Sequence, residues 1–205
     1  MSKEIVSEAP AAYGIAQRIA AAMEPWCLPK RCSEADYLAL ETNQLIEFTD
    51  GALEVLPMPN ELHQTMAVLL VNMLLAFSPR GKALSAPFRL NLQRPSGNYR
   101  EPDVIYLMNR ADGRRAKDVW TGADLVMEIV SPGGEQRDYI EKRADYAGAG
   151  ISEYWIIDPE LRTITVLKLD GTQYIEHGNF ALGQVATSVL LPGFSVDVTA
   201  IFNAE

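Results

Sequence analysis

The sequence has few of the residues that disulfide frameworks and structural zinc sites require. Its 205 residues include two cysteines, Cys27 and Cys32, and two histidines. Two thiols are too few for a disulfide framework, and the histidines lie far from each other in the sequence. We therefore expect reduced thiols and no structural zinc.

Long hydrophobic runs and an excess of positive charge are also missing. The longest apolar stretch, residues 66–77, is interrupted by Asn72 and falls short of the roughly 20 residues that cross a bilayer. The first residues carry acids and no run typical of a signal peptide, so we expect a cytoplasmic protein without a membrane span. A net charge of -9 argues against a surface coated in basic residues, but it is compatible with a local basic groove.

Length and composition favour one domain with an N-terminal extension. The chain is 48% hydrophobic, which suits a sizeable core. Alanine-rich residues 11–23 have helical spacing, so we expect a helical extension over residues 1–32 and a domain over 33–205.

The domain is predicted to be of the α/β (α+β) class. Apolar periodicity and turn residues predict helices over 34–41, 60–77 and 138–149, a hairpin over 45–56, and strands near 83–93, 104–107, 125–130, 154–157, 163–169, 173–176 and 194–198. The strand-helix-strand step from 125 to 157 predicts two parallel strands. We expect a mixed β-sheet flanked by helices, with extra antiparallel strands towards the C-terminus.

Two acids stand in or beside apolar strands. Asp103 opens the strand at 104–107, and Glu128 lies inside the strand at 125–130. A buried carboxylate is costly unless it is paired or binds a metal, so the two acids together indicate a functional site. As alternatives, Glu128 faces solvent or pairs with Arg143, and Asp103 is an ordinary turn residue at a strand start.

A lysine on the following helix completes the pattern. Lys142 would orient a water or offset charge on a phosphate if it reached the two acids. Alternatively, it forms a surface pair with Asp138 at i,i+4 spacing. This spacing places Asp138, Lys142 and Tyr146 on one side and predicts that Ile140 and the alanines meet the sheet.

Four motifs in this region occur together and in order. They are REPDV at 100–104, DLVMEIVSP at 124–132, RDYIEK at 137–142 and YWIIDP at 154–159. From residue 33 to the C-terminus the chain resembles the Uma family of bacterial restriction-endonuclease-like proteins, within the PD-(D/E)xK nuclease superfamily. The resemblance implies a restriction-endonuclease-like core, with a central mixed sheet between helices.

The resemblance also implies catalytic roles. Asp103 corresponds to the aspartate of the PD motif and Glu128 to the second acid. The motif lysine is normally two residues after that acid, where this chain has Val130. Lys142 is the implied substitute, with Asp138 beside it in support.

A Mg²⁺ or Mn²⁺ cofactor follows from the same resemblance, since hard cations prefer oxygen ligands. Its implied ligands are Asp103, Glu128 and the Ile129 carbonyl, with Glu54 as an additional ligand. His63 would support the site as a phosphate contact or through a ligand. Alternatively, it is a histidine satisfied at a helix start.

These residues predict a metal-dependent endonuclease that hydrolyses DNA phosphodiester bonds, as a homo-oligomer. Candidate contacts to the nucleic acid are Arg89, Arg94, Arg100, Arg114 and Arg115. Such a charge run is also typical of a solvated face.

Two other hypotheses stay open. One is an inactive nuclease-like scaffold that acts as an interaction or mobile-element-associated module, which the acidic net charge and the displaced lysine favour. The other is a small-molecule hydrolase that uses the same acids.

Overall fold

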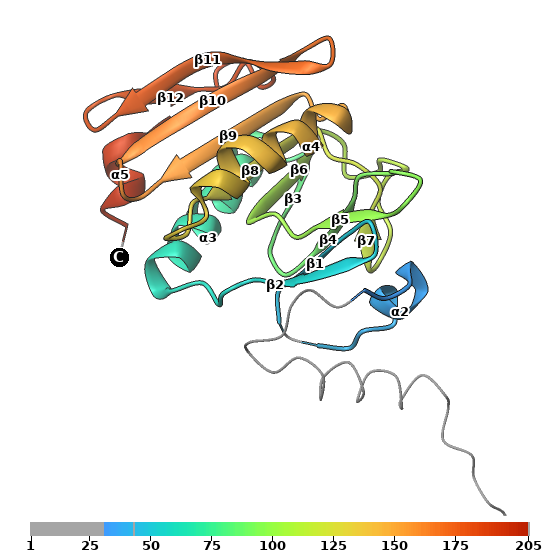
Figure 1. The fold of residues 1–205 in the computed structure, drawn as a ribbon. Coiled ribbons are helices and arrows are strands. Elements are labelled where there is room, and N and C mark those ends of the chain that lie inside the picture. The colour runs from blue at the N-terminus through green and yellow to red at the C-terminus, as the bar shows by residue number, and fades with distance from the viewer. Residues whose placement is uncertain (1–30, 43, 205) are drawn as a thin grey trace, which may run out of the picture.

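A six-stranded mixed sheet forms the centre of the fold (Figure 1). The computed structural model describes residues 31–42 and 44–204, so the helix predicted over 11–23 and Cys27 lie outside the described residues. The strand order is β11-β10-β9-β8-β6-β3. The strands are β3 (Lys82–Ser85), β6 (Val104–Leu107), β8 (Leu125–Ile129), β9 (Glu153–Asp158), β10 (Thr163–Asp170) and β11 (Gln173–Ala181).

The central pair of strands, β8 and β9, is parallel as predicted, and their neighbours pair antiparallel. The connection between them contains a π-helical turn, η1 (Arg137–Glu141), that continues into α4 (Lys142–Gly148). The predicted helix over 138–149 therefore exists, but its first turn is π-helical.

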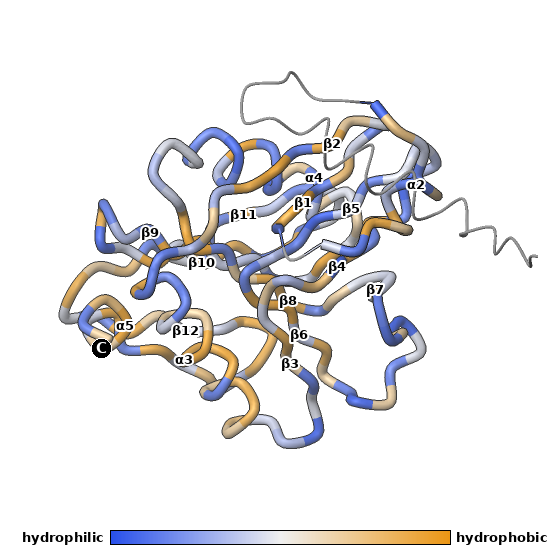
Figure 2. Tube along the Cα trace, turned by 90° about the horizontal axis from the view of Figure 1, so that it is seen from below, coloured by the Kyte–Doolittle hydropathy of each residue, from blue (hydrophilic) through white to orange (hydrophobic). Residues whose placement is uncertain are grey.

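Helices cover the two faces of this sheet. The long helix α3 (Glu61–Phe77) lies on one face and α4 on the other (Figure 1). Along β8, Met127 and Ile129 pack in the core cluster under α3, whereas Val126 belongs to the cluster under α4. Because side chains alternate along a strand, Glu128 points to the α4 face. Hydrophobic residues concentrate along α3, β6 and β8 (Figure 2).

A five-stranded sheet packs beside the first, in the order β2-β1-β5-β4-β7. Its strands are β1 (Ile46–Thr49), β2 (Ala52–Val55), β4 (Arg89–Asn91), β5 (Asn98–Arg100) and β7 (Val119–Trp120). The predicted hairpin is β1-β2. Asp50 (φ 51°) and Gly51 (φ 85°) both adopt the left-handed conformation that such a tight turn requires.

The predicted strand over 83–93 is divided in two. β3 and β4 flank Pro87 and belong to different sheets. Proline lacks the N–H that a continuous ladder needs, so the alternating pattern here spans two short strands rather than one.

Short elements complete the domain. They are α2 (Glu34–Leu38), the strand pair β12 (Val185–Thr187) and β13 (Ser195–Asp197), and α5 (Val198–Phe202). Ser33 and Asp36 form a capping box on α2. The side chain of Asp197 accepts a hydrogen bond from Ala200 N and caps the start of α5. The strand predicted to run to Val198 therefore ends at Asp197. None of the helices within the described residues is long and apolar enough to cross a membrane.

The burial of α3 generates a stability prediction. Leu70→Ala removes a fully buried side chain and should lower the free energy of unfolding by about 2 to 5 kcal/mol. Val68→Ala, on the same helix and 54% exposed, should change it by less than about 0.5 kcal/mol. Urea denaturation measures both values, and equal losses would contradict the assigned core face of α3.

Candidate active site

One small cleft beside the ends of β6 and β8 collects the residues singled out in the sequence. It is lined by Asp103, Glu128, Lys142, His63 and Asp138, among others. The free space inside it is about 20 Å³, enough for one water molecule. We call it the catalytic cleft, after the role that the sequence predicts for these residues.

Asp103 connects three elements at the floor of this cleft. Its Oδ2 accepts a hydrogen bond from Ile129 N at 2.7 Å, and its Oδ1 lies 2.8 Å from His63 Nε2. His63 is in the first turn of α3, where its backbone N–H donates to Asn60 Oδ1 at 2.9 Å. The start of β6, the end of β8 and the N-terminus of α3 are thereby joined through one carboxylate.

Glu128 is buried, with 2% exposure. Its Oε2 lies 2.9 Å from Lys142 Nζ, and its Oε1 accepts a hydrogen bond from the Tyr146 hydroxyl. The alternative of a solvent-facing glutamate is therefore wrong. The alternative partner, Arg143, donates instead to the carbonyl of Tyr174 at 2.9 Å.

The ammonium of Lys142 is surrounded by three acids. Nζ lies 2.9 Å from Glu128, 3.2 Å from Asp138 Oδ1 and 3.8 Å from Glu47 Oε1. All four side chains are at most 3% exposed, so the pair with Asp138 is not on the surface. We call these four residues the Lys142 cluster.

The helix turns its charged side chains towards the sheet, opposite to the orientation expected from hydrophobicity. Asp138, Lys142 and Tyr146 are buried against the sheet, whereas Ile140 is 57% exposed. The prediction that Ile140 and Ala144 meet the sheet is therefore wrong, because both are exposed, whereas Ala147 is buried as expected. The ammonium of Lys142 pairs with Glu128 on β8 and Glu47 on β1, and these ion pairs hold this face of the helix against the sheet.

Glu47 is a site residue that we did not predict. It lies in β1 between Ile46 and Phe48 and is 1% exposed. An acid between two apolar residues of a strand is the same signal that identified Glu128. Glu47 could therefore have been predicted from the sequence by the same reasoning.

A buried arginine holds Glu47 in place. Arg100 Nη1 lies 2.5 Å from Glu47, and Arg100 donates to Asp145 Oδ2 from Nε at 3.0 Å and from Nη2 at 2.6 Å. Arg94 Nη2 lies 2.6 Å from the other oxygen of Asp145. The guanidinium of Arg100 is thus occupied by acids inside the protein, and it fixes the β1-β2 hairpin against α4.

The other arginines proposed for nucleic-acid contact lie outside the catalytic cleft. Arg89 donates to the carbonyls of Leu38 and Leu40 and lies over the ring of Tyr37. Arg114 pairs with Asp112 and Asp124. Arg115 lies 5.9 Å from the centre of the Trp120 ring.

Glu54 lies at the rim and does not line the catalytic cleft. Its side chain is 53% exposed, and its Oε1 is 3.1 Å from Arg137 Nη1. Arg137 does line the cleft, so Glu54 contacts the site through this arginine. Ile129 lines the cleft directly.

Burial and the surrounding charges shift the pKa values of the residues in the Lys142 cluster. Burial raises the pKa of Glu128 to about 8, with Asp103 and Asp138 adding to the rise and Lys142 opposing it. Burial alone would lower the pKa of Lys142, but Glu128, Glu47 and Asp138 raise it above its ordinary value. Lys142 is therefore an ammonium at neutral pH. For Glu47, burial is outweighed by Lys142 and Arg100, which lower its pKa.

The acids at this site fit a divalent cation. Among residues 31–42 and 44–204, no three His, Cys, Asp or Glu side chains form a ready-made cage for a metal ion. Asp138 Oδ1 is buried and makes no hydrogen bond among the described residues, although Lys142 Nζ lies 3.2 Å from it, and burial together with Asp103 and Asp138 raises the pKa of Glu128. Oxygen donors of this kind fit hard cations such as Mg²⁺ and Mn²⁺. Since both oxygens of Glu128 are already bound, one to Lys142 and one to Tyr146, we expect Glu128 to move when an ion binds.

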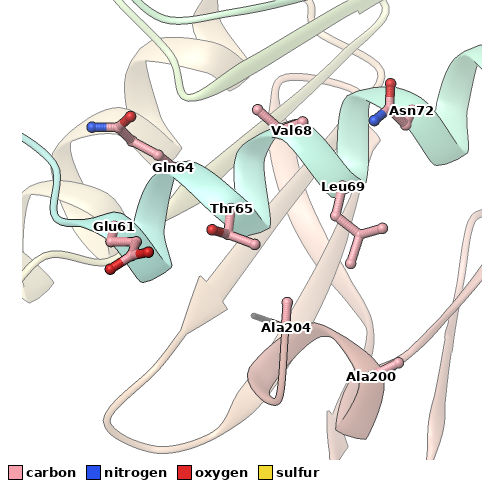
Figure 3. A pocket seen from close by; sticks show the side chains of 8 residues that line it. All are labelled: Glu61, Gln64, Thr65, Val68, Leu69, Asn72, Ala200 and Ala204. Atoms are coloured by element: carbon pink, nitrogen blue, oxygen red, sulfur yellow. The ribbon is translucent and has the colours of Figure 1, made fainter.

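A wider hollow than the catalytic cleft lies elsewhere among the described residues. It is a groove of about 760 Å³ between α3 and α5, and Figure 3 shows the side chains that line it, from Glu61 to Asn72 and at Ala200 and Ala204. Glu61 is the ionisable residue among the described residues lining it, so this groove offers little chemistry for hydrolysis.

Comparison with known proteins identifies the family of the chain. Residues 34–199 match the model of the Uma2 family, described as "Putative restriction endonuclease". The chain belongs to the Uma2 family. The family prediction is thus confirmed, and all the residues lining the catalytic cleft lie within the matched range.

The fold is shared with a solved structure. The crystal structure of a "putative nuclease belonging to DUF820" from Anabaena variabilis ATCC 29413 superposes with a TM-score of 0.67 and is 17% identical in sequence. The alignment covers 83% of this chain and 97% of that chain, which confirms the predicted fold class of this Uma2 protein. No curated protein matches the chain.

The raised pKa of Glu128 predicts how the stability of this Uma2 protein depends on pH. The folded state retains a proton on Glu128 up to about pH 8, whereas the unfolded chain releases it near 4.5. This contribution to stability is complete below about pH 4.5 and is lost as the pH rises through 8, with a slope of at most about 1.4 kcal/mol per pH unit.

Glu128→Gln should remove this pH-dependent contribution to stability, because glutamine does not titrate. Urea denaturation with a chelator at pH 5, 6, 7 and 8 should show the wild type losing stability relative to Glu128→Gln. Glu176→Gln, on the exposed side of β11, should follow the wild type. Parallel curves for Glu128→Gln and the wild type would contradict the assignment.

Proposed function

We propose that this protein is a divalent-metal-dependent endonuclease that hydrolyses phosphodiester bonds in DNA. The observation that supports this proposal is the meeting of Asp103, Glu128 and Lys142 in one cleft, although they come from two strands and a helix. Membership of a family described as restriction endonucleases adds the substrate class.

The oxygen atoms at the cleft are the proposed ligands of Mg²⁺ or Mn²⁺. They are the carboxylates of Asp103 and Glu128 and the carbonyl of Ile129. Ile129 N–H faces Asp103, and the C=O of a strand residue points to the same side as its N–H. A bound divalent cation polarises the phosphate and lowers the pKa of a coordinated water. Glu54 is a further proposed ligand, reached by a movement of the hairpin rim.

Lys142 acts in this proposal as a fixed positive charge. Its raised pKa keeps it protonated, so it cannot be the base that takes a proton from water. It can donate hydrogen bonds that orient the attacking water and offset the charge that develops on the phosphate. Asp138 and Glu47 hold the ammonium in position, and His63 orients Asp103 through their 2.8 Å contact.

DNA would be held by arginines outside the cleft. Arg89, Arg94, Arg114 and Arg115 are the proposed phosphate contacts. Arg100 drops out of this set because it is buried between Glu47 and Asp145, whereas Arg94 and Arg114, although also paired with acids, are 38% and 35% exposed. We further propose that the enzyme acts in the bacterial cytoplasm as a homo-oligomer. Size-exclusion chromatography with light scattering tests the oligomeric state directly.

A cleavage assay tests the proposed chemistry. The wild type should cut plasmid DNA in the presence of Mn²⁺ or Mg²⁺, and Asp103→Ala, Glu128→Gln and Lys142→Met should each reduce the rate by about 100-fold or more. Glu176→Ala and Lys168→Met, outside the cleft, should cut like the wild type. Equal cleavage by all variants, with unchanged circular dichroism, would refute the assignment.

An inactive nuclease-like scaffold is the second candidate. It is favoured by the closed state of the cleft, where Lys142 is already paired with three acids. Titration calorimetry separates the two candidates. The nuclease should bind Mn²⁺ in the millimolar range or tighter, and this heat should disappear in Asp103→Ala. A wild type that binds no Mn²⁺ would favour the scaffold.

A further inference from the structure

A second cleft opens directly beside the catalytic cleft. Its volume is about 380 Å³, within the range of small-molecule sites. The two clefts share Pro57, Pro59, His63 and Ser131 in their linings. Because these four residues line both clefts, a group attached to a phosphate at the first cleft would lie within reach of the second. We call it the side cleft.

The side cleft lies at the carboxyl ends of the parallel strands β8 and β9. One wall comes from the segment that leads into α3, and the other comes from the turns after β8 and β9, around Pro132 and Pro159. This end of parallel strands is where open α/β sheets bind their ligands.

The charge of the side cleft excludes phosphate. Its described lining contains the acids Glu135, Asp158 and Glu160 and no lysine or arginine. The Asp158 carboxylate is held in place by the hydroxyl of Tyr139 at 3.0 Å and by two backbone N–H groups. The part of a nucleic acid that fits beside these acids is uncharged and carries hydrogen-bond donors, as the exocyclic amino groups of bases do.

The walls of the side cleft suit a flat ring. Met58 is 69% exposed and Leu62 is 38% exposed, so both present apolar surface on the α3 side. A methionine sulfur makes favourable contacts with aromatic rings. Proline rings opposite them add a rigid apolar surface, so a planar base can lie between the walls.

We propose that the side cleft holds an unpaired nucleobase of the strand that is cut. This inference rests on the proposed nuclease function and adds a substrate class to it. A base inside a duplex is stacked and paired and cannot enter, whereas a base in a single strand can, at little cost. The protein should therefore prefer single-stranded or locally unpaired DNA over intact duplex.

Fluorescence of a single 2-aminopurine in a short oligonucleotide tests this directly, because the emission of this base responds to stacking. With Asp103→Asn as the background and Mn²⁺ present, the single strand should bind at least about tenfold more tightly than the same sequence in a duplex. Met58→Ala combined with Leu62→Ala should weaken single-strand binding about three- to tenfold. Met108→Ala, at the other end of β6 and 47% exposed, should bind normally.

The outcomes separate this inference from the function on which it rests. Duplex binding as tight as single-strand binding, or unchanged binding in the double variant, would overturn the side-cleft assignment. If the wild-type protein nevertheless cut duplex plasmid, the proposed nuclease function would hold and only the side-cleft assignment would fall. An absence of both binding and cleavage for every DNA form would overturn both.

Discussion

The buried ammonium of Lys142, between carboxylates from three separate elements, is the interaction on which the architecture of the site depends. Glu47 comes from the hairpin, Glu128 from the central sheet and Asp138 from the π-helical turn. Each of these charges would be costly if it were left alone in the interior. The hairpin, the sheet and α4 must therefore meet at this point, and Arg100 extends the network to Asp145.

This network also explains why a lysine outside the PD-(D/E)xK motif can occupy the site. The position two residues after Glu128 is Val130, which packs in the apolar cluster under α4. The π-helical turn brings Lys142 to the same carboxylate, where its backbone N–H donates to the Arg137 carbonyl. The three acids keep the ammonium charged, and burial, with the neighbouring acids Asp103 and Asp138 adding to it, raises the pKa of Glu128. This composition is what supports the proposed metal site.

Much of the fold could be predicted from local signals. The Asp50-Gly51 turn specified the hairpin, the apolar stripe specified α3, and the crossover from 125 to 157 specified the parallel pair. Burial of Glu128 followed from its position in an apolar strand. The sequence could not show that α4 turns its charged face inward, because that choice depends on acids from distant segments. Glu47 carried the same signal as Glu128, but its role depends on a tertiary contact with Lys142, and the burial of Arg100 depends on Asp145, 45 residues away.

A crystal structure with Mn²⁺ measures the central claim most directly, since anomalous scattering locates the ion independently of activity. The account predicts one Mn²⁺ in the catalytic cleft, about 2.0 to 2.6 Å from oxygens of Asp103 and Glu128, with Glu128 moved away from Lys142 or Tyr146. An empty cleft at millimolar Mn²⁺, with Glu128 still bound to Lys142 and Tyr146, would contradict it.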